Sequence, residues 1–285
     1  MIKLFKNKIF KLFVYLILFF VVIFLYSKYI GINGLEVREY RIESSVLTNN
    51  FSGLKVVHFS DLLYGSSTDM DDVSNLVSKI NILKPDIVLF TGDLISSGVN
   101  ISINEKNELI KYLSNINANI GKYAIYGDED YSFKSYDVIM NNSSFKLLNN
   151  SYEEIYYKNN DYMYIVGIPS SIKEKAKLNE SFEFYKDEDR RYTIVMVHEG
   201  ASIKTLNNST YEVDLIVGGH SLNGSVKLPI IGGLFIPKDS YKYYDEYYEK
   251  GITNIYISGG LGTSEYDYRL FIRPSYNLYR LKAQS

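Results

Sequence analysis

The sequence predicts an α/β fold of helix-flanked sheets, preceded by one N-terminal helix that is apolar enough to cross a membrane. In the first half of the chain, short apolar segments alternate with helical patterns, and strand-like segments dominate the second half. An unbroken apolar run lies near the N-terminus. With 285 residues, of which 46% are hydrophobic, the chain is long enough for one large domain.

The apolar run extends from Leu12 to Tyr26, between Lys11 and Lys28. At about 1.5 Å per residue it is slightly short for a hydrocarbon core of roughly 30 Å, but both lysines can reach the membrane surface. The run is apolar on every face, which favours a membrane span over a buried core helix. A cleaved signal peptide is the competing interpretation, but the bulky residues after the run form no small-residue cleavage site. We therefore expect a transmembrane anchor at residues 12–27.

Lysines before the anchor indicate its orientation, because positively charged flanks tend to stay in the cytoplasm. We expect a single-pass protein of the cell membrane, with residues 1–11 as a cytoplasmic tail and residues 28–34 as a linker. The remaining domain, 35–285, would then be extracytoplasmic. The four lysines are Lys3, Lys6, Lys8 and Lys11.

Hydrophobic periodicity places the regular elements of this domain. The strands are predicted at 35–42, 54–59, 87–90, 123–126, 152–157, 162–166, 192–197, 213–217 and 252–257, with 152–157 and 162–166 as a hairpin. The helices are predicted at 71–83 and 105–113.

Composition excludes several classes of function. The formal net charge is −2 and no cluster of Lys and Arg is dense enough to follow a phosphate backbone, so we expect no nucleic-acid partner. The chain has no cysteine, which excludes disulfides and thiolate zinc sites.

Five polar blocks each begin where an apolar strand ends. They are Ser60–Leu63, Thr91–Asp93, Gly127–Asp130, Val197–Glu199 and Gly218–Gly224. Ligand sites of open α/β sheets gather beyond the carboxyl ends of the strands. We therefore expect the blocks to meet at one site, with Asp61, Asp93, Asp128, His198 and His220 as candidate metal ligands. The third histidine, His58, lies inside a strand and is expected to be a core residue.

The blocks resemble, in order, those of the calcineurin-like metallophosphoesterases, which read D-x-H, G-D, G-N-H-[DE], H and G-H-x-H. The resemblance is to the membrane-anchored branch of YkuE and the relatives of UDP-2,3-diacylglucosamine pyrophosphatase. It implies a four-layer αββα sandwich with two central mixed sheets, and it covers roughly residues 35–281. It extends to the strings Val226–Pro229, Gly232–Pro237, Gly259–Ser264 and Arg269–Pro274.

In that family, two histidines help to hold the first metal ion. The positions that match the first ion's ligands are here Asp61, Leu63, Asp93 and Leu222, so leucine stands where both imidazoles belong. Because leucine offers no donor atom, we expect the first ion site to be lost.

The resemblance assigns the second ion to the aspartate shared by both sites and to three further residues. These positions hold Asp93, Asp128, His198 and His220, all of which can bind a divalent cation. We therefore expect one divalent ion, Mn, Zn or Fe, in a one-sided centre.

The family's general acid, a histidine, is replaced here by Glu129. A carboxyl with an ordinary pKa of about 4.3 is a poor proton donor at neutral pH unless burial or neighbouring carboxylates raise that pKa. Glu129 is therefore a candidate acid, a candidate donor to the ion, or a solvated side chain.

Formal charge also disfavours phosphate binding, because one divalent ion does not neutralise Asp61, Asp93 and Asp128. Basic residues would have to compensate, and we name Arg269, Arg273 and Lys227 as candidates. The loops 96–103 and 241–250 are expected to line the pocket.

Three functions remain open. The chain is at most a weak one-metal phosphoester or phosphodiester hydrolase acting on a phosphorylated lipid or envelope precursor, with Asp61 orienting water. Alternatively, it is a non-catalytic relative that binds a ligand or partner in the same pocket at the membrane, which Leu63 and Leu222 favour. A purely structural anchor without metal would leave His198 and His220 unexplained.

Overall fold

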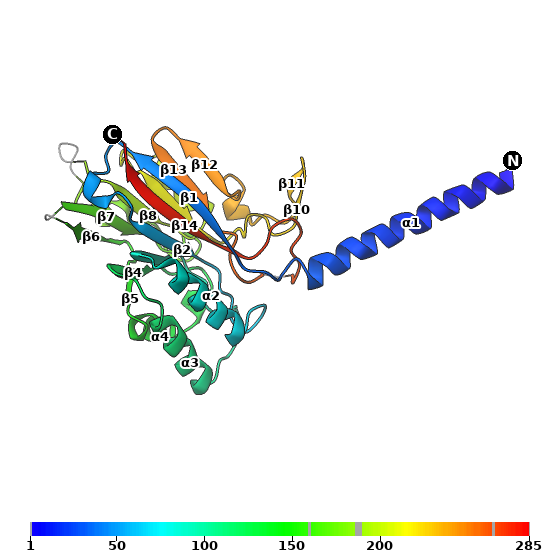
Figure 1. Cartoon of the computed structure of the whole chain (residues 1–285), viewed down its shortest axis with the longest axis horizontal. Coiled ribbons are helices and arrows are strands. Elements are labelled where there is room, and N and C mark those ends of the chain that lie inside the picture. Colours follow the sequence, from blue (N-terminus) through cyan, green and yellow to red (C-terminus); the bar gives the residue numbers. More distant parts are fainter. Residues whose placement is uncertain (1, 159–160, 186–189, 264–265, 285) are drawn as a thin grey trace.

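Two mixed sheets, each of six strands in the part of the chain that is described, form the centre of the molecule (Figure 1). The computed structural model describes residues 2–158, 161–185, 190–263 and 266–284. The first sheet comprises, in spatial order, β1 (Glu36–Ser44), β14 (Ser275–Ala283), β2 (Lys55–Phe59), β3 (Ile87–Phe90), β4 (Gly121–Ala124) and β5 (Phe145–Leu147). The second comprises β12 (Tyr247–Lys250), β13 (Thr253–Ile257), β9 (Leu215–Gly218), β8 (Thr193–Met196), β7 (Asp161–Gly167) and β6 (Ser151–Tyr157).

Strand direction brings the polar blocks to one edge of the sheets. Strands β2, β3, β4 and β5 are parallel, as are β7, β8, β9 and β13. The expected hairpin is present, because β6 pairs antiparallel with β7. Strand β14, which the sequence did not predict, lies between β1 and β2 and pairs parallel with β1 and antiparallel with β2.

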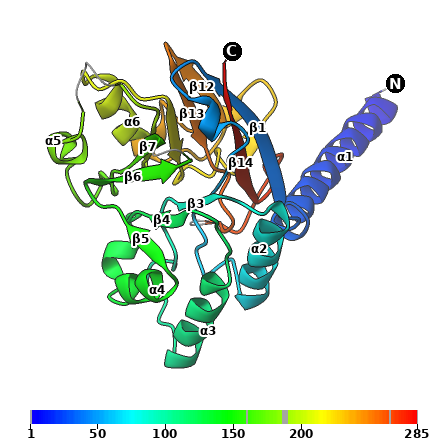
Figure 2. The same cartoon turned by 60° about the vertical axis from the view of Figure 1, so that its left-hand side comes forward.

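Helices cover the outer face of each sheet (Figure 2), so the predicted four-layer αββα sandwich is confirmed. One core lies between the sheets, and a second packs the first sheet against its helices. The helices of the first sheet are α2 (Met70–Leu83), α3 (Ile103–Ser114) and α4 (Tyr136–Asn142); α5 (Leu178–Ser181) and α6 (Gly200–Asn207) belong to the second half. Capping boxes start α2 at Asp69 and α3 at Ser102, and both helices match the ranges that hydrophobic periodicity predicted, 71–83 and 105–113.

Helix α1 (Ile2–Tyr29) projects from the domain as a single rod (Figure 1). Its segment Lys8–Tyr29 has a mean hydropathy of 2.7 and is not buried against the domain, so it is long and apolar enough to cross a membrane. The helix also includes residues assigned above to the tail and the start of the linker. Its last turn contacts the domain, where the backbone N–H of Arg269 donates to the carbonyl of Ser27 at 3.0 Å.

Candidate metal centre

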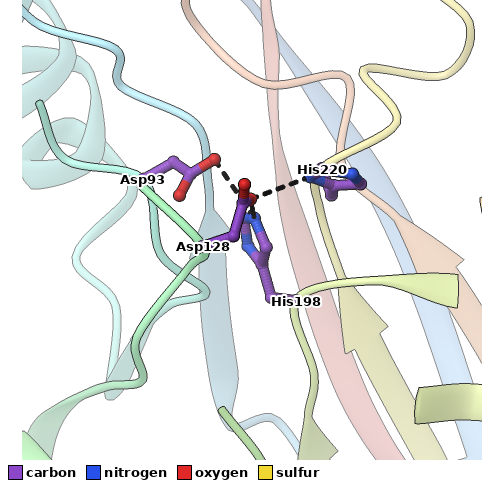
Figure 3. A group of neighbouring side chains, drawn as sticks. All are labelled: Asp93, Asp128, His198 and His220. Carbon is purple, nitrogen blue, oxygen red and sulfur yellow. Dashed lines mark hydrogen bonds and ion pairs between the residues drawn. The ribbon is translucent and has the colours of Figure 1, made fainter. Parts of the chain in front are cut away.

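Four potential metal ligands meet beyond the carboxyl ends of the strands (Figure 3). Asp93 follows β3, Asp128 follows β4, His198 follows β8 and His220 follows β9. One donor atom from each of the four lies within 4.8 Å of all the others. The two halves of the sandwich therefore supply two ligands each, as their positions at strand ends led us to expect.

The histidines point their ring nitrogens at the carboxylates. Nε2 of His198 lies 3.1 Å from Oδ2 of Asp93 and 3.2 Å from Oδ1 of Asp128. Nδ1 of His220 lies 3.2 Å from the same Asp128 oxygen. The other ring nitrogen of His198, Nδ1, is 2.6 Å from the carbonyl oxygen of Thr91. A carbonyl partner of this kind fixes the tautomer in which Nε2 keeps its lone pair for an ion.

The electrostatics of this group favour a cation. Burial lowers the pKa of His198, but the Asp93 carboxylate, followed by that of Asp128, raises it well above its ordinary value. The same opposition of burial and Asp128 raises the pKa of His220. A set of two oxygen and two nitrogen donors fits Zn, Mn or Fe, and a bound ion would compete with these protons.

Close backbone approach builds the centre. A Cβ atom added at Gly92 would lie 2.2 Å from the backbone nitrogen of Gly127, and one at Gly127 would lie 2.1 Å from Oδ1 of Asp93. The loops after β3 and β4 could not pack so closely with side chains there. Asp93 and His220 themselves have positive φ angles of 61° and 64°. Backbone strain of this kind is common at functional sites, where the surrounding structure stabilises the unfavourable conformation.

Asp130 is a residue of the site that the sequence did not predict. Its buried carboxylate accepts hydrogen bonds from the backbone N–H groups of Asp93 (2.8 Å), Leu94 (2.9 Å) and Gly127 (2.8 Å). It thereby joins the two loops that carry Asp93 and Asp128. The only signal in the sequence was its place at the end of the third block, where the family pattern also has an acidic residue.

Asp61 lies beside the four ligands but is not part of their group. Its carboxylate oxygens each accept a hydrogen bond from the backbone N–H of His220 at 3.1 Å. Burial raises the pKa of Asp61, and the charge of Asp93 adds to the effect. Asp61 therefore orients the His220 loop while it faces the cavity.

The two leucines occupy the other half of the centre. Leu63 and Leu222 are 2% and 3% exposed, and both line the cavity. The backbone N–H of Leu63 donates to the carbonyl of Asp93 at 3.1 Å. A Cβ added at Gly260 would lie 2.3 Å from Cδ2 of Leu222 and 3.0 Å from Cβ of Asp61. Hydrocarbon thus lines the same cavity as both carboxylates that a first ion would need.

Glu129 is fixed rather than freely solvated. Its Oε2 accepts a hydrogen bond from the backbone N–H of Ser97 at 2.5 Å, and its own N–H donates to Oδ1 of Asp93 at 3.0 Å. Burial, together with the charge of Asp93, raises the pKa of Glu129 to about 7. These surroundings meet the condition stated above for a carboxyl that donates a proton near neutral pH.

The ligands open into a cavity of about 620 Å³. Its lining combines acidic side chains and His220 with apolar and aromatic residues, which we call the apolar wall. The apolar wall consists of Leu63, Leu222, residues 233–237, Tyr241 and Tyr266. The sequence did not predict the segment 233–237 as a wall. Of the two expected loops, 241–250 contributes Tyr241, while residues 96–100 line a neighbouring cavity beside Glu129.

The expectation that basic residues compensate the charge is wrong for the described lining of this cavity, which contains no Lys or Arg. Arg269 is fully buried, and its Nη2 donates to the carbonyls of Gly260 and Gly262. Lys227 pairs with Asp245. Arg273 does not line the cavity either. Ser264, the last residue of the glycine-rich string, lies outside the described residues.

A two-sheet sandwich with metal donors at its strand ends defines a metallophosphoesterase-type protein. Residues 54–224 match the family described as calcineurin-like phosphoesterase, and the chain belongs to this family. The family uses divalent metals.

Two curated proteins and one solved structure are similar to this chain. The uncharacterized metallophosphoesterase YkuE of Bacillus subtilis is 29% identical over 264 residues, which cover 90% of this chain and 89% of YkuE. The UDP-2,3-diacylglucosamine pyrophosphatase LpxG of Chlamydia muridarum is 34% identical over 80 residues, 28% of this chain and 23% of LpxG. Among solved structures, TT1561 of Thermus thermophilus aligns with a TM-score of 0.46 at 11% identity, over 73% of this chain and 90% of TT1561.

Proposed function

We propose that this chain holds one divalent cation and is at most a weak phosphoester or phosphodiester hydrolase acting on a lipid-linked or envelope phosphate at the membrane. The ion, Mn, Zn or Fe, would be bound by Asp93, Asp128, His198 and His220. The observation that carries the proposal is the convergence of these four donors within 4.8 Å, next to a wall where leucine replaces further ligands.

Each polar residue has a defined task in this scheme. A bound ion supplies Lewis acidity and lowers the pKa of a coordinated water. Asp130 holds the two ligand loops together, and Asp61 orients the backbone of His220 and the water beside it. Glu129, with its pKa near 7, would protonate the leaving oxygen.

Charge explains why we expect turnover to be weak. One divalent ion against the carboxylates of Asp61, Asp93 and Asp128 leaves a net negative centre, and Glu129 adds to it whenever it is ionised. The described lining of the cavity offers no Lys or Arg to attract a phosphate. A second ion would normally share the developing charge of the transition state.

A non-catalytic function in the same cavity is the second candidate. Leu63, Leu222 and the apolar wall favour it, because they suit the hydrocarbon part of an amphiphilic ligand. In this case the ion would position a headgroup without cleaving it.

The anchor supports a location at the cell membrane. Helix α1 has the length and composition to span a bilayer, and the lysines that precede its apolar segment favour a cytoplasmic N-terminus with the domain on the extracytoplasmic side. The lipid substrate class rests on the name of LpxG, to which a part of this chain is similar.

Metal analysis tests the proposal directly. We expect the full chain, purified in detergent and loaded with Mn²⁺ or Zn²⁺, to bind one ion, and His198→Ala and His220→Ala each to lose it. His58→Gln is the matched control, because it changes the remaining histidine of the chain, which is outside the group of four ligands. Two tightly held ions in the unchanged chain, with rapid hydrolysis of a soluble aryl phosphodiester, would overturn the one-ion proposal. One ion without hydrolysis of either this ester or a lipid-borne phosphate would identify the non-catalytic alternative.

A further inference from the structure

An exposed apolar hairpin stands beside the metal cavity. We use the term apolar hairpin for residues 228–235, which include the end of β10 (Lys227–Leu228) and all of β11 (Gly232–Gly233). From 228 to 237 the sequence contains no charged or polar side chain. Ile230 is fully exposed, Ile231 is 71% exposed and Phe235 is 57% exposed. Soluble surfaces rarely gather so many large apolar side chains in one place.

A neighbouring segment enlarges this surface. Val226 bridges to Leu270 and Phe271, and the side chain of Phe271 is 65% exposed. Phe271 and Ile230 line one shallow surface hollow. Both have positive φ angles, 61° and 73°, a backbone conformation that is unfavourable for bulky residues. The fold therefore exposes the side chains of Ile230 and Phe271 although their backbone conformation is energetically unfavourable.

The same segment is attached to the end of α1. The ring of Tyr268 contacts that of Phe24 at 5.2 Å between centroids, and the N–H of Arg269 donates to the carbonyl of Ser27 at 3.0 Å. A Cβ at Gly31 would lie 1.9 Å from the carbonyl oxygen of Arg269, so the chain after α1 packs directly on this segment. Figure 1 shows β10 and β11 at the edge of the domain from which α1 projects.

A bilayer that contains α1 would therefore reach the apolar hairpin. The apolar segment of α1 ends at Tyr29, which places the membrane surface level with its last turn. Three exposed tyrosines agree with this level, because tyrosine is enriched at membrane interfaces. Tyr29 is the last residue of α1, and Tyr241 and Tyr266 line the cavity.

We propose that the apolar hairpin and Phe271 insert into the interfacial layer of the bilayer that holds α1, so that the metal cavity opens at the lipid headgroups. Leu234 and Phe235 belong both to the hairpin and to the wall of the cavity, which places its mouth against the membrane. The inference rests on the membrane anchoring proposed above and is independent of catalysis.

Tryptophan fluorescence tests the insertion, since the chain has no tryptophan of its own. The full chain carrying Ile231→Trp is reconstituted into phosphatidylcholine vesicles with brominated acyl chains. We expect its emission to move to shorter wavelength and to be mostly quenched, as for a side chain about 5–10 Å below the headgroup boundary. Tyr156→Trp is the negative control, because Tyr156 is 58% exposed on β6 in the second sheet.

Phe20→Trp, in the middle of α1, tests the membrane anchoring separately from the insertion of the hairpin. If Phe20→Trp is quenched while Ile231→Trp emits like Tyr156→Trp, the anchoring stands and the insertion of the hairpin is wrong. If Phe20→Trp is also unquenched, both the anchoring and the insertion are wrong. Metal content, measured on the same samples, reports separately on the proposed metal centre.

Discussion

The carboxylate of Asp61 accepts one bifurcated hydrogen bond from the backbone N–H of His220, at 3.1 Å to each oxygen. His220 holds its ligand position with a φ of 64°, a conformation that costs energy without external support. Asp61 provides that support from the opposite sheet. A residue that matches a ligand of the first ion in the family pattern therefore shapes here the histidine loop of the proposed single-ion site.

Removal of this support should weaken metal binding although Asp61 is outside the group of four ligands. We expect Asp61→Ala to lower the affinity for Mn²⁺ or Zn²⁺ by about 10-fold or more, the usual effect of losing a residue that orients a ligand. Asp61→Asn keeps one acceptor oxygen and should lose less. Calorimetric titration of both variants checks this order, and an unchanged affinity in Asp61→Ala would contradict the role.

The leucine wall predicts that a second ion can be restored. Leu63→His and Leu222→His together would place imidazoles beside Asp61 and Asp93, and both positions already have φ angles near 50°, which histidine tolerates. We expect elemental analysis to rise from one ion to two per chain. Leu234 lines the same cavity but does not match a ligand position of the family pattern, so Leu234→His should leave the count at one. No gain in the double variant would count against our assignment of the first site.

The position of Glu129 predicts a dependence on the leaving group. An acid catalyst matters most when the departing oxygen is strongly basic, so Glu129→Gln should slow an alkyl phosphodiester by about 10²-fold and an aryl one much less. With a pKa of about 7, the protonated form is lost as pH rises, so the kcat of the unchanged chain for the alkyl ester should fall above neutrality. Glu108→Gln, an exposed carboxylate on α3, is the control. Equal effects on both esters would rule out proton donation.

His58 predicts a loss of stability in acid. It is fully buried in β2, as expected from the sequence, and contacts the hydroxyl of Thr91 at 2.9 Å. Burial lowers its pKa from 6.5 to about 3, so between these values the unfolded chain binds the proton and the folded chain does not. Stability is therefore lost as pH falls below 6.5, and His58 alone should account for about 2 kcal/mol between pH 7 and pH 5.

Urea unfolding of the full chain in detergent at pH 7 and pH 5 measures the contribution of His58 to the free energy of unfolding. His58→Gln keeps a hydrogen-bonding side chain without a titrating group, so its unfolding free energy should change less between pH 7 and pH 5. The same change in both proteins would assign the acid sensitivity to other groups.

The candidate ligands could be located from the sequence because parallel strands bring their carboxyl ends to one edge. Each polar block follows an apolar strand, and this pattern needs no knowledge of distant partners. Asp130 could not be assigned, because its partners are backbone N–H groups of another loop and backbone groups leave no mark in a sequence. The charge compensation expected from Arg269 failed for a related reason, since its partners are carbonyls of a glycine-rich turn.

Strand β14 escaped prediction because its burial does not follow an apolar pattern. Ser275 and Asn277 are buried polar residues, while Arg280 and Lys282 alternate with apolar ones only at the end of the strand. Its neighbours are far away in sequence, as the contact of Tyr279 with His58 across 221 positions shows. The apolar wall at 233–237 was missed because an apolar segment is more often core than an exposed surface.

The place of β14 between β1 and β2 has a consequence for biosynthesis. The two strands made first cannot be bridged until the polypeptide has been synthesised as far as Ala283, so each keeps a bare edge throughout translation. Strand β1, which follows α1 directly along the chain, spends this interval with that edge unpaired. Chaperone protection of that edge should therefore limit the yield of folded molecules more than the speed of helix formation does.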